Sequence, residues 1–262
     1  MDKIIMKKPL IFYPKPISNS VLQLICFPYA GGGISSFIPL KQKLPEGIGL
    51  GIIELPGRGE KYFENFYSEP LKLINDLVEE LQTNIQIPTI YWGHSLGANI
   101  AFELTATMKD RNMVLPQHVI VSGSVPSSFE KERKNWEKMN DDKLLHEIKE
   151  FGGTPKEIFD NKELLQILLP MLRSDLILGS KFPERKGCYT AVEASVLSGK
   201  NDTIKEIELQ AWSDHFNIVN PIKWFEGGHF FINESELNVH MFILEIIGKY
   251  SQKIKNIREL NQ

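Results

Sequence analysis

Short apolar runs alternate with segments of helical periodicity along most of this chain. The apolar runs predict strands near residues 21–27, 48–54, 89–93, 118–123, 191–198 and 217–225. Helical spacing of apolar residues, as in the segment 71–81 after Pro70, predicts helices between most of these strands. The alternation is typical of an α/β fold, in which helices cover both faces of a mainly parallel sheet.

One interval, residues 126–186, departs from this alternation. Its apolar residues recur with helical periodicity in the segments 144–151 and 164–169, which are separated by glycines and a proline. We interpret the interval as a helical lid inserted after the fourth of these strands. The flanking ranges, 1–125 and 187–262, then form the core of the domain.

A serine stands between a predicted strand and a predicted helix, in the pentapeptide Gly-His-Ser-Leu-Gly at residues 93–97. Glycines on both sides of Ser95 permit a tight turn and a close approach of the strand to the helix. Such a turn presents the hydroxyl at the sheet edge, and the helix N-terminus behind it favours negative charge. We therefore predict that Ser95 is a nucleophile on a strand–turn–helix elbow.

A serine nucleophile needs a histidine base, and His229 is our candidate. It follows an apolar run and stands behind Gly227-Gly228, a flexible loop that can bring an imidazole over the serine. His215 is the alternative, although we expect it to lie on a helix. Of the other four histidines, one lies within the elbow, two lie before any predicted strand that could carry the acid, and one lies in a segment with helical periodicity.

The base needs a carboxylate that orients it, and Asp202 is our candidate. It lies in the turn after the strand predicted at 191–198, which is where the acid of such a triad is expected. A helix cap before Thr203 is the structural alternative for this residue. Asp175 and Asp214 are the other candidate acids, and neither directly follows a predicted strand.

An oxyanion hole needs two backbone N–H groups that point at the developing charge. Leu96, directly after the nucleophile, supplies one. The other is expected from the loop 27–33, which follows an early strand and contains three consecutive glycines. This loop lacks the spacing of a phosphate-binding loop, so we interpret it as the oxyanion loop. Either Tyr29 or Ala30 is the second donor.

Several motifs together resemble the type II thioesterases that accompany nonribosomal peptide and polyketide synthetases, within the α/β-hydrolases. The resemblance covers most of the chain, and its motifs are residues 26–32, 55–59, 93–97, 151–155, 172–175 and 225–231. The segment 179–188 lacks the pattern expected after the lid. The resemblance implies a Ser-Asp-His triad that hydrolyses acyl or aminoacyl thioesters on the phosphopantetheine of carrier proteins. It also implies a role in antibiotic biosynthesis, as an editor of misprimed synthetases.

Composition agrees with a globular enzyme of 262 residues and a formal net charge of −3, which gives no reason to expect nucleic-acid binding. Two cysteines make neither a disulfide framework nor a metal site. The prolines near the N-terminus interrupt any signal-peptide core, and no membrane span is present. We expect a cytoplasmic monomer that needs no cofactor or metal and binds carrier-protein domains.

Two other functions share these features. A general carboxylesterase or lipase would use the same residues on oxygen esters, and a non-catalytic binding module could retain the elbow. Carrier proteins are acidic by resemblance, so basic residues near the start of the lid are candidate contacts with them: Lys131, Arg133, Lys134 and Lys138.

Overall fold

The computed structural model describes residues 8–84, 87–129, 134–153 and 156–260. Within this part of the chain, eight strands form one sheet in the order β1-β3-β2-β4-β5-β6-β7, and β8 also pairs with β6. Every pairing is parallel except that of β1 with β3. The strands are β1 (Ile11–Lys15), β2 (Leu22–Phe27), β3 (Ile48–Ile53), β4 (Thr89–His94), β5 (His118–Ser122), β6 (Thr190–Gly199), β7 (Phe216–Ile218) and β8 (Lys223–Phe225).

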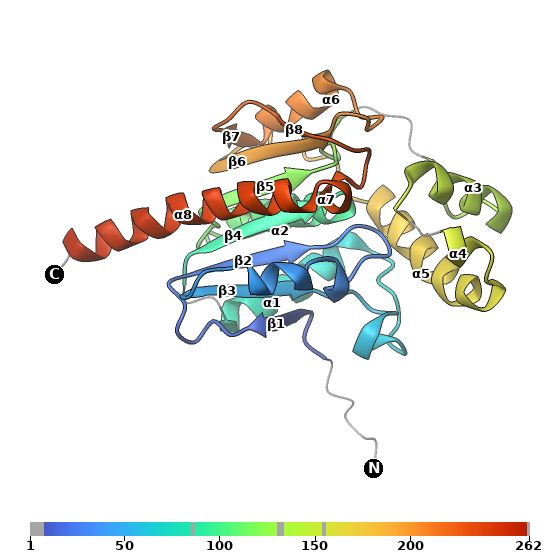
Figure 1. The fold of residues 1–262 in the computed structure, drawn as a ribbon, viewed down its shortest axis with the longest axis horizontal. Helices are drawn as coiled ribbons and strands as arrows, with labels where there is room; N and C mark the ends of the chain where they lie inside the picture. Colours follow the sequence, from blue (N-terminus) through green and yellow to red (C-terminus); the bar gives the residue numbers. More distant parts are fainter. Residues whose placement is uncertain (1–7, 85–86, 130–133, 154–155, 261–262) are drawn as a thin grey trace, which may run out of the picture.

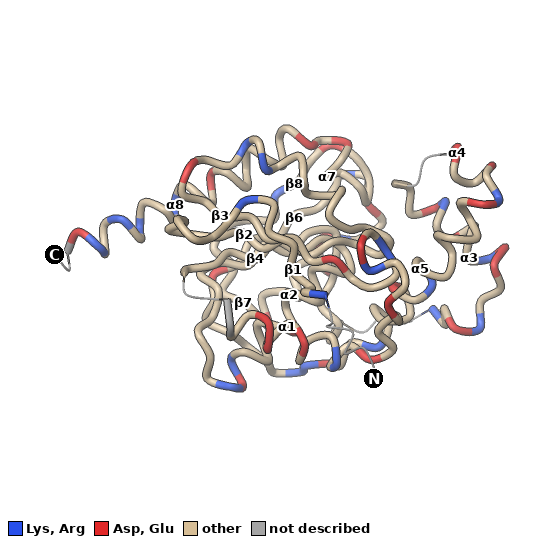
Figure 2. The backbone as a smooth tube through the Cα atoms, turned by 90° about the horizontal axis from the view of Figure 1, so that it is seen from below, with Lys and Arg blue, Asp and Glu red and all other residues tan. Residues whose placement is uncertain are grey.

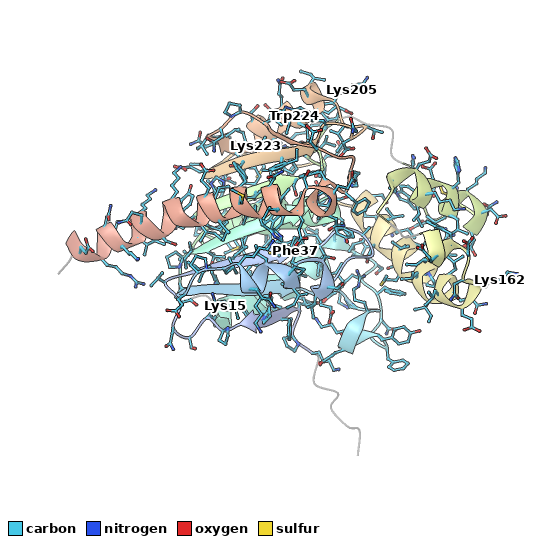
Figure 3. The ribbon with its side chains drawn as sticks, in the orientation of Figure 1. Lys15, Phe37, Lys162, Lys205, Lys223 and Trp224 are labelled. Atoms are coloured by element: carbon cyan, nitrogen blue, oxygen red, sulfur yellow. The ribbon has the colours of Figure 1, made fainter. Side chains whose placement is uncertain are left out.

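Helices cover both faces of the sheet, as the alternating pattern predicts (Figure 1). On one face, α1 (Pro70–Asn84) and α2 (Leu96–Asp110) bury their apolar stripes against the strands. On the other face lie α7 (Phe231–Glu234), α8 (Glu236–Leu260) and two short 3₁₀ helices within residues 34–42. Phe37 is fully buried in this second layer (Figure 3), with its ring edge-on to Trp92.

One strand prediction needs correction, and one strand of the structure was not predicted. The run predicted as a single strand over 217–225 forms β7 and β8, because Asn220-Pro221 interrupts it and proline cannot donate a ladder hydrogen bond. The prolines near the N-terminus concealed β1, which contains Pro14. Proline is tolerated there because β1 lies at the edge of the sheet, where one row of N–H groups needs no partner strand.

The segment between β5 and β6 contains α3 (Asp141–Phe151), α4 (Lys156–Phe159) and α5 (Lys162–Ser180), which we call the helical insertion. It packs around an apolar cluster of its own that includes Trp136, Leu144 and Ile148. Asn140 and Asn161 cap its two longer helices through their side-chain oxygens. Strands β2, β4 and β5 point toward the insertion, and Lys162 extends from its outer end (Figures 1 and 3).

Polar contacts join the two ends of the helical insertion to each other and to the core. The Ser127 hydroxyl donates to the Pro183 carbonyl at 2.7 Å. Beyond it, the guanidinium of Arg185 binds the carboxylate of Glu103, which is fully buried in α2, and also that of Asp110. The segment 179–188, which lacks the pattern expected after the lid, therefore anchors the insertion to α2.

No helix among the residues described here combines the length and the apolar character needed to cross a bilayer.

Candidate active site

Ser95 occupies a sharp turn between β4 and α2, with φ 53° and ψ −117°. Such a positive φ is uncommon for a residue with a side chain and costs about 1–3 kcal/mol, so the surroundings must hold it in place. The Ser95 N–H donates to the carbonyl of Ser122 in the neighbouring strand β5 at 2.8 Å. The turn therefore places the serine hydroxyl at the carboxyl end of the central strands.

The two glycines that flank Ser95 are required by close backbone approaches. A Cβ on Gly97 would lie 1.9 Å from the carbonyl oxygen of Phe27, and one on Gly93 would lie 2.2 Å from that of Gly97. Any side chain at either position would push α2 away from β4 or β2. The Gly-x-Ser-x-Gly pattern is thus explained by packing around the turn.

The structure brings Ser95, His229 and Asp202 into one hydrogen-bonded line. With the proton of the imidazole on Nδ1, the Ser95 hydroxyl donates to His229 Nε2 at 3.0 Å. His229 Nδ1 then donates to Asp202 Oδ2 at 2.9 Å. The side chain of Asp202 is almost completely buried, whereas the imidazole is partly exposed to the pocket. A base thus contacts a hydroxyl, and a buried carboxylate orients the base.

Backbone contacts between two loops fix the positions of Asp202 and His229. Asp202 follows β6, and His229 lies in the loop between β8 and α7. The N–H of Asn201 donates to the carbonyl of Gly227 at 2.9 Å. A Cβ on Gly199 would lie 2.1 Å from the carbonyl oxygen of Gly228, so the loops are in direct contact.

Asp202 does not cap a helix. The next helix, α6 (Glu206–Gln210), begins four residues later, and the backbone N–H groups from which Asp202 accepts, those of Thr203 and Ile204, lie before it. Burial raises the pKa of the Asp202 carboxyl, but hydrogen bonds from His229 and from the N–H groups of Thr203 and Ile204 outweigh it and hold that pKa below its ordinary value. Asp202 is therefore an anion that accepts the hydrogen bond from His229 Nδ1.

His94, the second residue of the elbow motif, lies beneath His229, with 5.3 Å between the ring centroids. Its Nδ1 donates to the hydroxyl of Ser122, which in turn donates to the carbonyl of Gly93. Complete burial holds the pKa of His94 well below its ordinary value, and the nearby His229 lowers it further. His94 is therefore a neutral ring that supports His229 without competing for its proton.

The alternative candidates lie elsewhere. His215 follows a 3₁₀ helix and is buried, and it donates from Nδ1 to the carbonyl of Cys188 while Nε2 contacts the Ser128 hydroxyl. Asp214 is exposed. Asp175 lies in α5 and forms an ion pair with Arg58. The carboxylate that contacts His229 is that of Asp202.

The loop 27–33 lies against the elbow, and Tyr29 and Ala30 both line the pocket that contains Ser95. The ring of Tyr29 stands edge-on to those of His94 and Phe230. Leu96 begins α2, next to the nucleophile candidate. Each proposed donor of the oxyanion hole is thus beside Ser95, and Tyr29 and Ala30 remain alternatives for the second.

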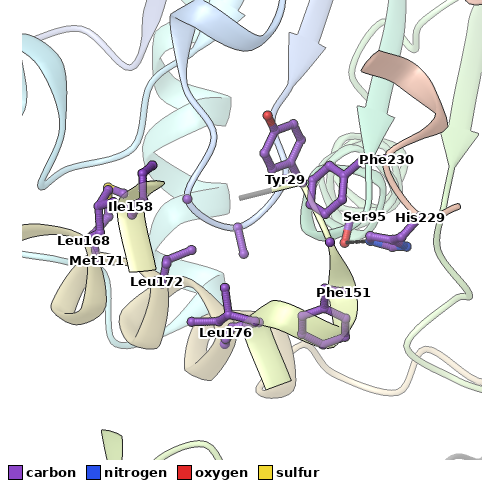
Figure 4. A pocket seen from close by; sticks show the side chains of 15 residues that line it. Tyr29, Ser95, Phe151, Ile158, Leu168, Met171, Leu172, Leu176, His229 and Phe230 are labelled. Carbon is purple, nitrogen blue, oxygen red and sulfur yellow. Dashed lines mark hydrogen bonds between the residues drawn. The ribbon is translucent and has the colours of Figure 1, made fainter. Parts of the chain in front are cut away.

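An apolar cavity of about 270 Å³ opens from Ser95 toward the helical insertion (Figure 4). Leu172 and Leu176 of α5 lie along its wall, and Phe151 at the end of α3 lies near His229, with ring centroids 6.1 Å apart. The apolar periodicity of the insertion predicts its helices, but not which residues face the cavity. Leu164 and Ile167, within the predicted apolar segment, are largely exposed.

A second cavity of about 450 Å³ also reaches Ser95 and has a more polar lining. Asn99, Ser124 and Lys134 are among the residues that line it. Ser95 thus stands where the two cavities meet. Within the described ranges, no cluster of three or more histidine, cysteine or carboxylate side chains could hold a metal ion.

The sequence matches the thioesterase domain family over residues 22–249. The chain belongs to this family. The gramicidin S biosynthesis protein GrsT of Aneurinibacillus migulanus is 30% identical over 227 residues, which cover 86% of this chain and 89% of GrsT. Thioesterase PikA5 of Streptomyces venezuelae is 30% identical over 233 residues, covering 85% and 79% of the two chains.

Among solved structures, that of the type II thioesterase BorB from the borrelidin biosynthetic cluster superposes with a TM-score of 0.81. The two sequences are 27% identical, and the match covers 91% of this chain and 97% of BorB. These similarities confirm the α/β-hydrolase fold and the resemblance to type II thioesterases. The protein is a thioester hydrolase.

The thioesterase contains another serine–histidine contact, which is buried in the core. His118 Nε2 accepts from the Ser195 hydroxyl at 2.9 Å, and Nδ1 donates to the phenolic oxygen of Tyr250 at 3.0 Å. His118 and Ser195 are each about 1% exposed, so a substrate cannot reach them. We interpret this pair as structural.

This interpretation predicts an acid-dependent loss of stability. Burial lowers the pKa of His118 to about 4. Between that value and the ordinary pKa of about 6.5, the unfolded chain binds a proton that the folded chain does not. The free energy of unfolding should therefore decrease as the pH falls through this window, with roughly 3 kcal/mol of the decrease due to His118.

Urea denaturation at pH 7.5 and pH 4.5 tests this prediction. His118→Gln should lose less stability between the two pH values than the wild type, and thioester hydrolysis should persist. Ser195→Ala is the matched control, because it removes the hydrogen bond but keeps the titrating ring and hence the pH dependence. Equal acid sensitivity in His118→Gln and the wild type would contradict the assignment.

Proposed function

We propose that this thioesterase removes acyl or aminoacyl groups from the phosphopantetheine arms of carrier proteins, and thereby restores misprimed synthetases. Ser95 is the nucleophile, His229 the general base and Asp202 the orienting acid. The observation that carries the proposal is the hydrogen-bonded line of these three side chains at the end of an apolar cavity. The similarity to GrsT and BorB, whose names connect them with the biosynthesis of gramicidin S and borrelidin, supports the choice of substrate.

In the first half-reaction, His229 Nε2 takes the proton of Ser95 as Oγ attacks the thioester carbonyl carbon. The tetrahedral intermediate carries its charge on the former carbonyl oxygen, which faces the N–H of Leu96 and that of Tyr29 or Ala30. The carbon–sulfur bond then breaks, and the thiolate takes the proton from His229. A thiol has a pKa near 8.5, so it leaves with less protonation than an alcohol or amine needs.

In the second half-reaction, water replaces the thiol. His229 takes a proton from the water, the hydroxide attacks the acyl carbon, and the Ser95 oxygen leaves with the proton that His229 returns. Asp202 remains an anion throughout and stabilises the imidazolium that forms in each half. We expect nucleophile activation and oxyanion stabilisation to supply most of the rate enhancement, the latter about 2.7–4 kcal/mol per donor.

Substitution of the three catalytic residues should give unequal losses. Ser95→Ala and His229→Ala should each lower kcat by roughly 10⁶-fold, because the residues act as a unit. Asp202→Asn should lower it by about 10⁴-fold, because the acid only orients and supports the base. Steady-state hydrolysis of a small acyl thioester measures each loss, with Ser195→Ala as a serine control. Near-normal activity in Asp202→Asn would transfer the acid role to another carboxylate.

Substrate class separates this proposal from its two rivals. We expect acyl-pantetheine thioesters to be hydrolysed faster than oxygen esters of the same acyl chain, as judged by kcat/KM. Equal or reversed preference would indicate a general carboxylesterase or lipase. Failure of a fluorophosphonate to label Ser95 would indicate a binding module without catalysis.

We further propose that residues 126–186 act as a lid on the core formed by 1–125 and 187–262. Gly152 and Gly153 at the end of α3 both have positive φ, and the conformational freedom of two consecutive glycines suits a hinge. A Cβ on Gly153 would lie 2.4 Å from the ring of Phe230, so this segment rests against the residue next to His229. A lid in this position excludes water from the acyl-enzyme.

The carrier protein should dock near the start of the lid. Of the four basic candidates, Lys131 and Arg133 lie outside the described residues. Lys134 contacts Glu147, lies over the rings of Trp136 and Phe151, and also lines the second cavity. Lys138 is exposed. Basic and acidic positions are interspersed over α3–α5 (Figure 2), so a docking contact requires particular residues rather than overall charge.

Charge reversal tests this docking surface. The triple variant Lys131→Glu, Arg133→Glu and Lys138→Glu should raise KM for a carrier-bound thioester, with little change for an N-acetylcysteamine thioester. Lys134 is left intact because of its contacts in the cavity. The control reverses Lys253, Lys255 and Arg258 on α8, far from the insertion in Figure 1. Equal losses on both substrates would indicate damage to the lid, and no loss would exclude this surface.

A further inference from the structure

Two motifs of the sequence, residues 55–59 and 172–175, contribute nothing to the hydrogen-bonded line of catalytic residues, yet they meet in space. Arg58 of the first motif donates from Nη2 to Oδ1 of Asp175 of the second at 2.7 Å. Arg58 is 8% exposed and Asp175 3% exposed. Such a buried ion pair has a high desolvation cost, so an arrangement of further hydrogen bonds around it is expected.

Those further bonds lead to the oxyanion loop. Oδ2 of Asp175 accepts from the backbone N–H of Gly31 at 2.8 Å, and Nη1 of Arg58 donates to the carbonyl of Gly32 at 2.6 Å. Leu172, one helical turn before Asp175, packs on the same loop, because a Cβ on Gly31 would lie 2.4 Å from its Cδ2. The ion pair thus links helix α5 of the insertion and the turn 55–59 to a single stretch of backbone.

The loop forms a β-turn whose middle peptide is the one that Asp175 binds. The N–H of Gly32 donates to the carbonyl of Tyr29 at 2.8 Å, which closes a turn with Ala30 and Gly31 at its centre. The φ of Gly31 is +80°, the value of the third residue in a type II turn. Types I and II differ mainly by a flip of this middle peptide. After such a flip, the Ala30 carbonyl oxygen would face the carboxylate of Asp175.

We propose that Arg58 and Asp175 are positioning residues that hold the oxyanion loop in its working conformation, an inference that rests on the proposed serine mechanism. Gly31, Gly32 and Gly33 leave this backbone free to adopt many conformations, and the buried pair restricts it to one. Oxyanion stabilisation depends on N–H groups that are aligned before the charge develops. The pair therefore acts on the transition state through Tyr29 or Ala30.

The double variant Arg58→Gln and Asp175→Asn tests the inference, because it removes the charges together and leaves no lone buried ion. We expect kcat for a small thioester to fall by about 10–100-fold, less than the loss of a whole donor, with KM changed less than twofold. The pH profile of kcat/KM should keep its apparent pKa, because the contacts of His229 are unchanged. Circular dichroism establishes that the variant is folded.

A pair of ketone inhibitors separates positioning from a purely structural role. A trifluoromethyl ketone with the substrate's acyl chain adds to Ser95 and places an oxyanion in the hole, whereas the matching methyl ketone binds without an oxyanion. The double variant should lose affinity for the first by about the factor lost in kcat, and keep its affinity for the second. Equal losses for both ketones, or no loss for either, would overturn the inference.

Two further proteins complete the experiment. Arg58→Lys is the substitute if the double variant does not fold. It keeps the ion pair with Asp175 but loses the second guanidinium nitrogen, which binds the Gly32 carbonyl. It should therefore lose affinity for the trifluoromethyl ketone but not for the methyl ketone, by a smaller factor than the double variant. Asp141→Asn is the matched control, because it breaks an ion pair with Arg173, which lies on α5 like Asp175. This variant should bind both ketones with the affinity of the wild type. A wild-type protein that forms no Ser95-dependent adduct would overturn the serine mechanism itself.

Discussion

The positive φ of Ser95 is the constraint on which the rest of the site depends. A residue with a side chain holds such a conformation only when its neighbours leave no alternative. Here the neighbours are the carbonyl of Ser122 in the next strand and the close contact of Gly97 with the backbone of Phe27. That contact also brings the loop after β2 beside the elbow. One strained turn thereby positions the nucleophile candidate and the oxyanion loop together.

Much of the fold and of the candidate site could be predicted because the relevant signals are local. Each parallel strand is a short apolar run between turn residues, and Ser95, Asp202 and His229 lie directly after such runs. The carboxyl ends of parallel strands meet at the same edge of a sheet. Position after a strand, together with the glycines beside Ser95 and His229, therefore selected three residues far apart in the sequence that the structure joins by hydrogen bonds.

Other features could not be predicted because they depend on contacts between distant segments. Arg58 and Asp175 are 117 residues apart, and neither follows a strand or has a periodic pattern that would reveal its partner. Asp175 was considered only as an alternative acid, although its carboxylate binds the oxyanion loop. Glu103 and Arg185, 82 residues apart, form a second such pair. Strand β1 was missed because the tolerance for Pro14 comes from its edge position.

The attachment of the helical insertion has a consequence for how this enzyme can change over evolution. Its two ends are held by Ser127 and Arg185, and its long helix touches the catalytic core through Asp175. The outer part of the insertion packs around its own cluster of Trp136, Leu144 and Ile148, whereas Leu178 of α5 belongs to the main core. Substitutions along the cavity wall can then alter which acyl chains fit, while these three anchors keep the reacting groups in place. The preference for an acyl chain can therefore evolve without changes to the residues that carry out hydrolysis.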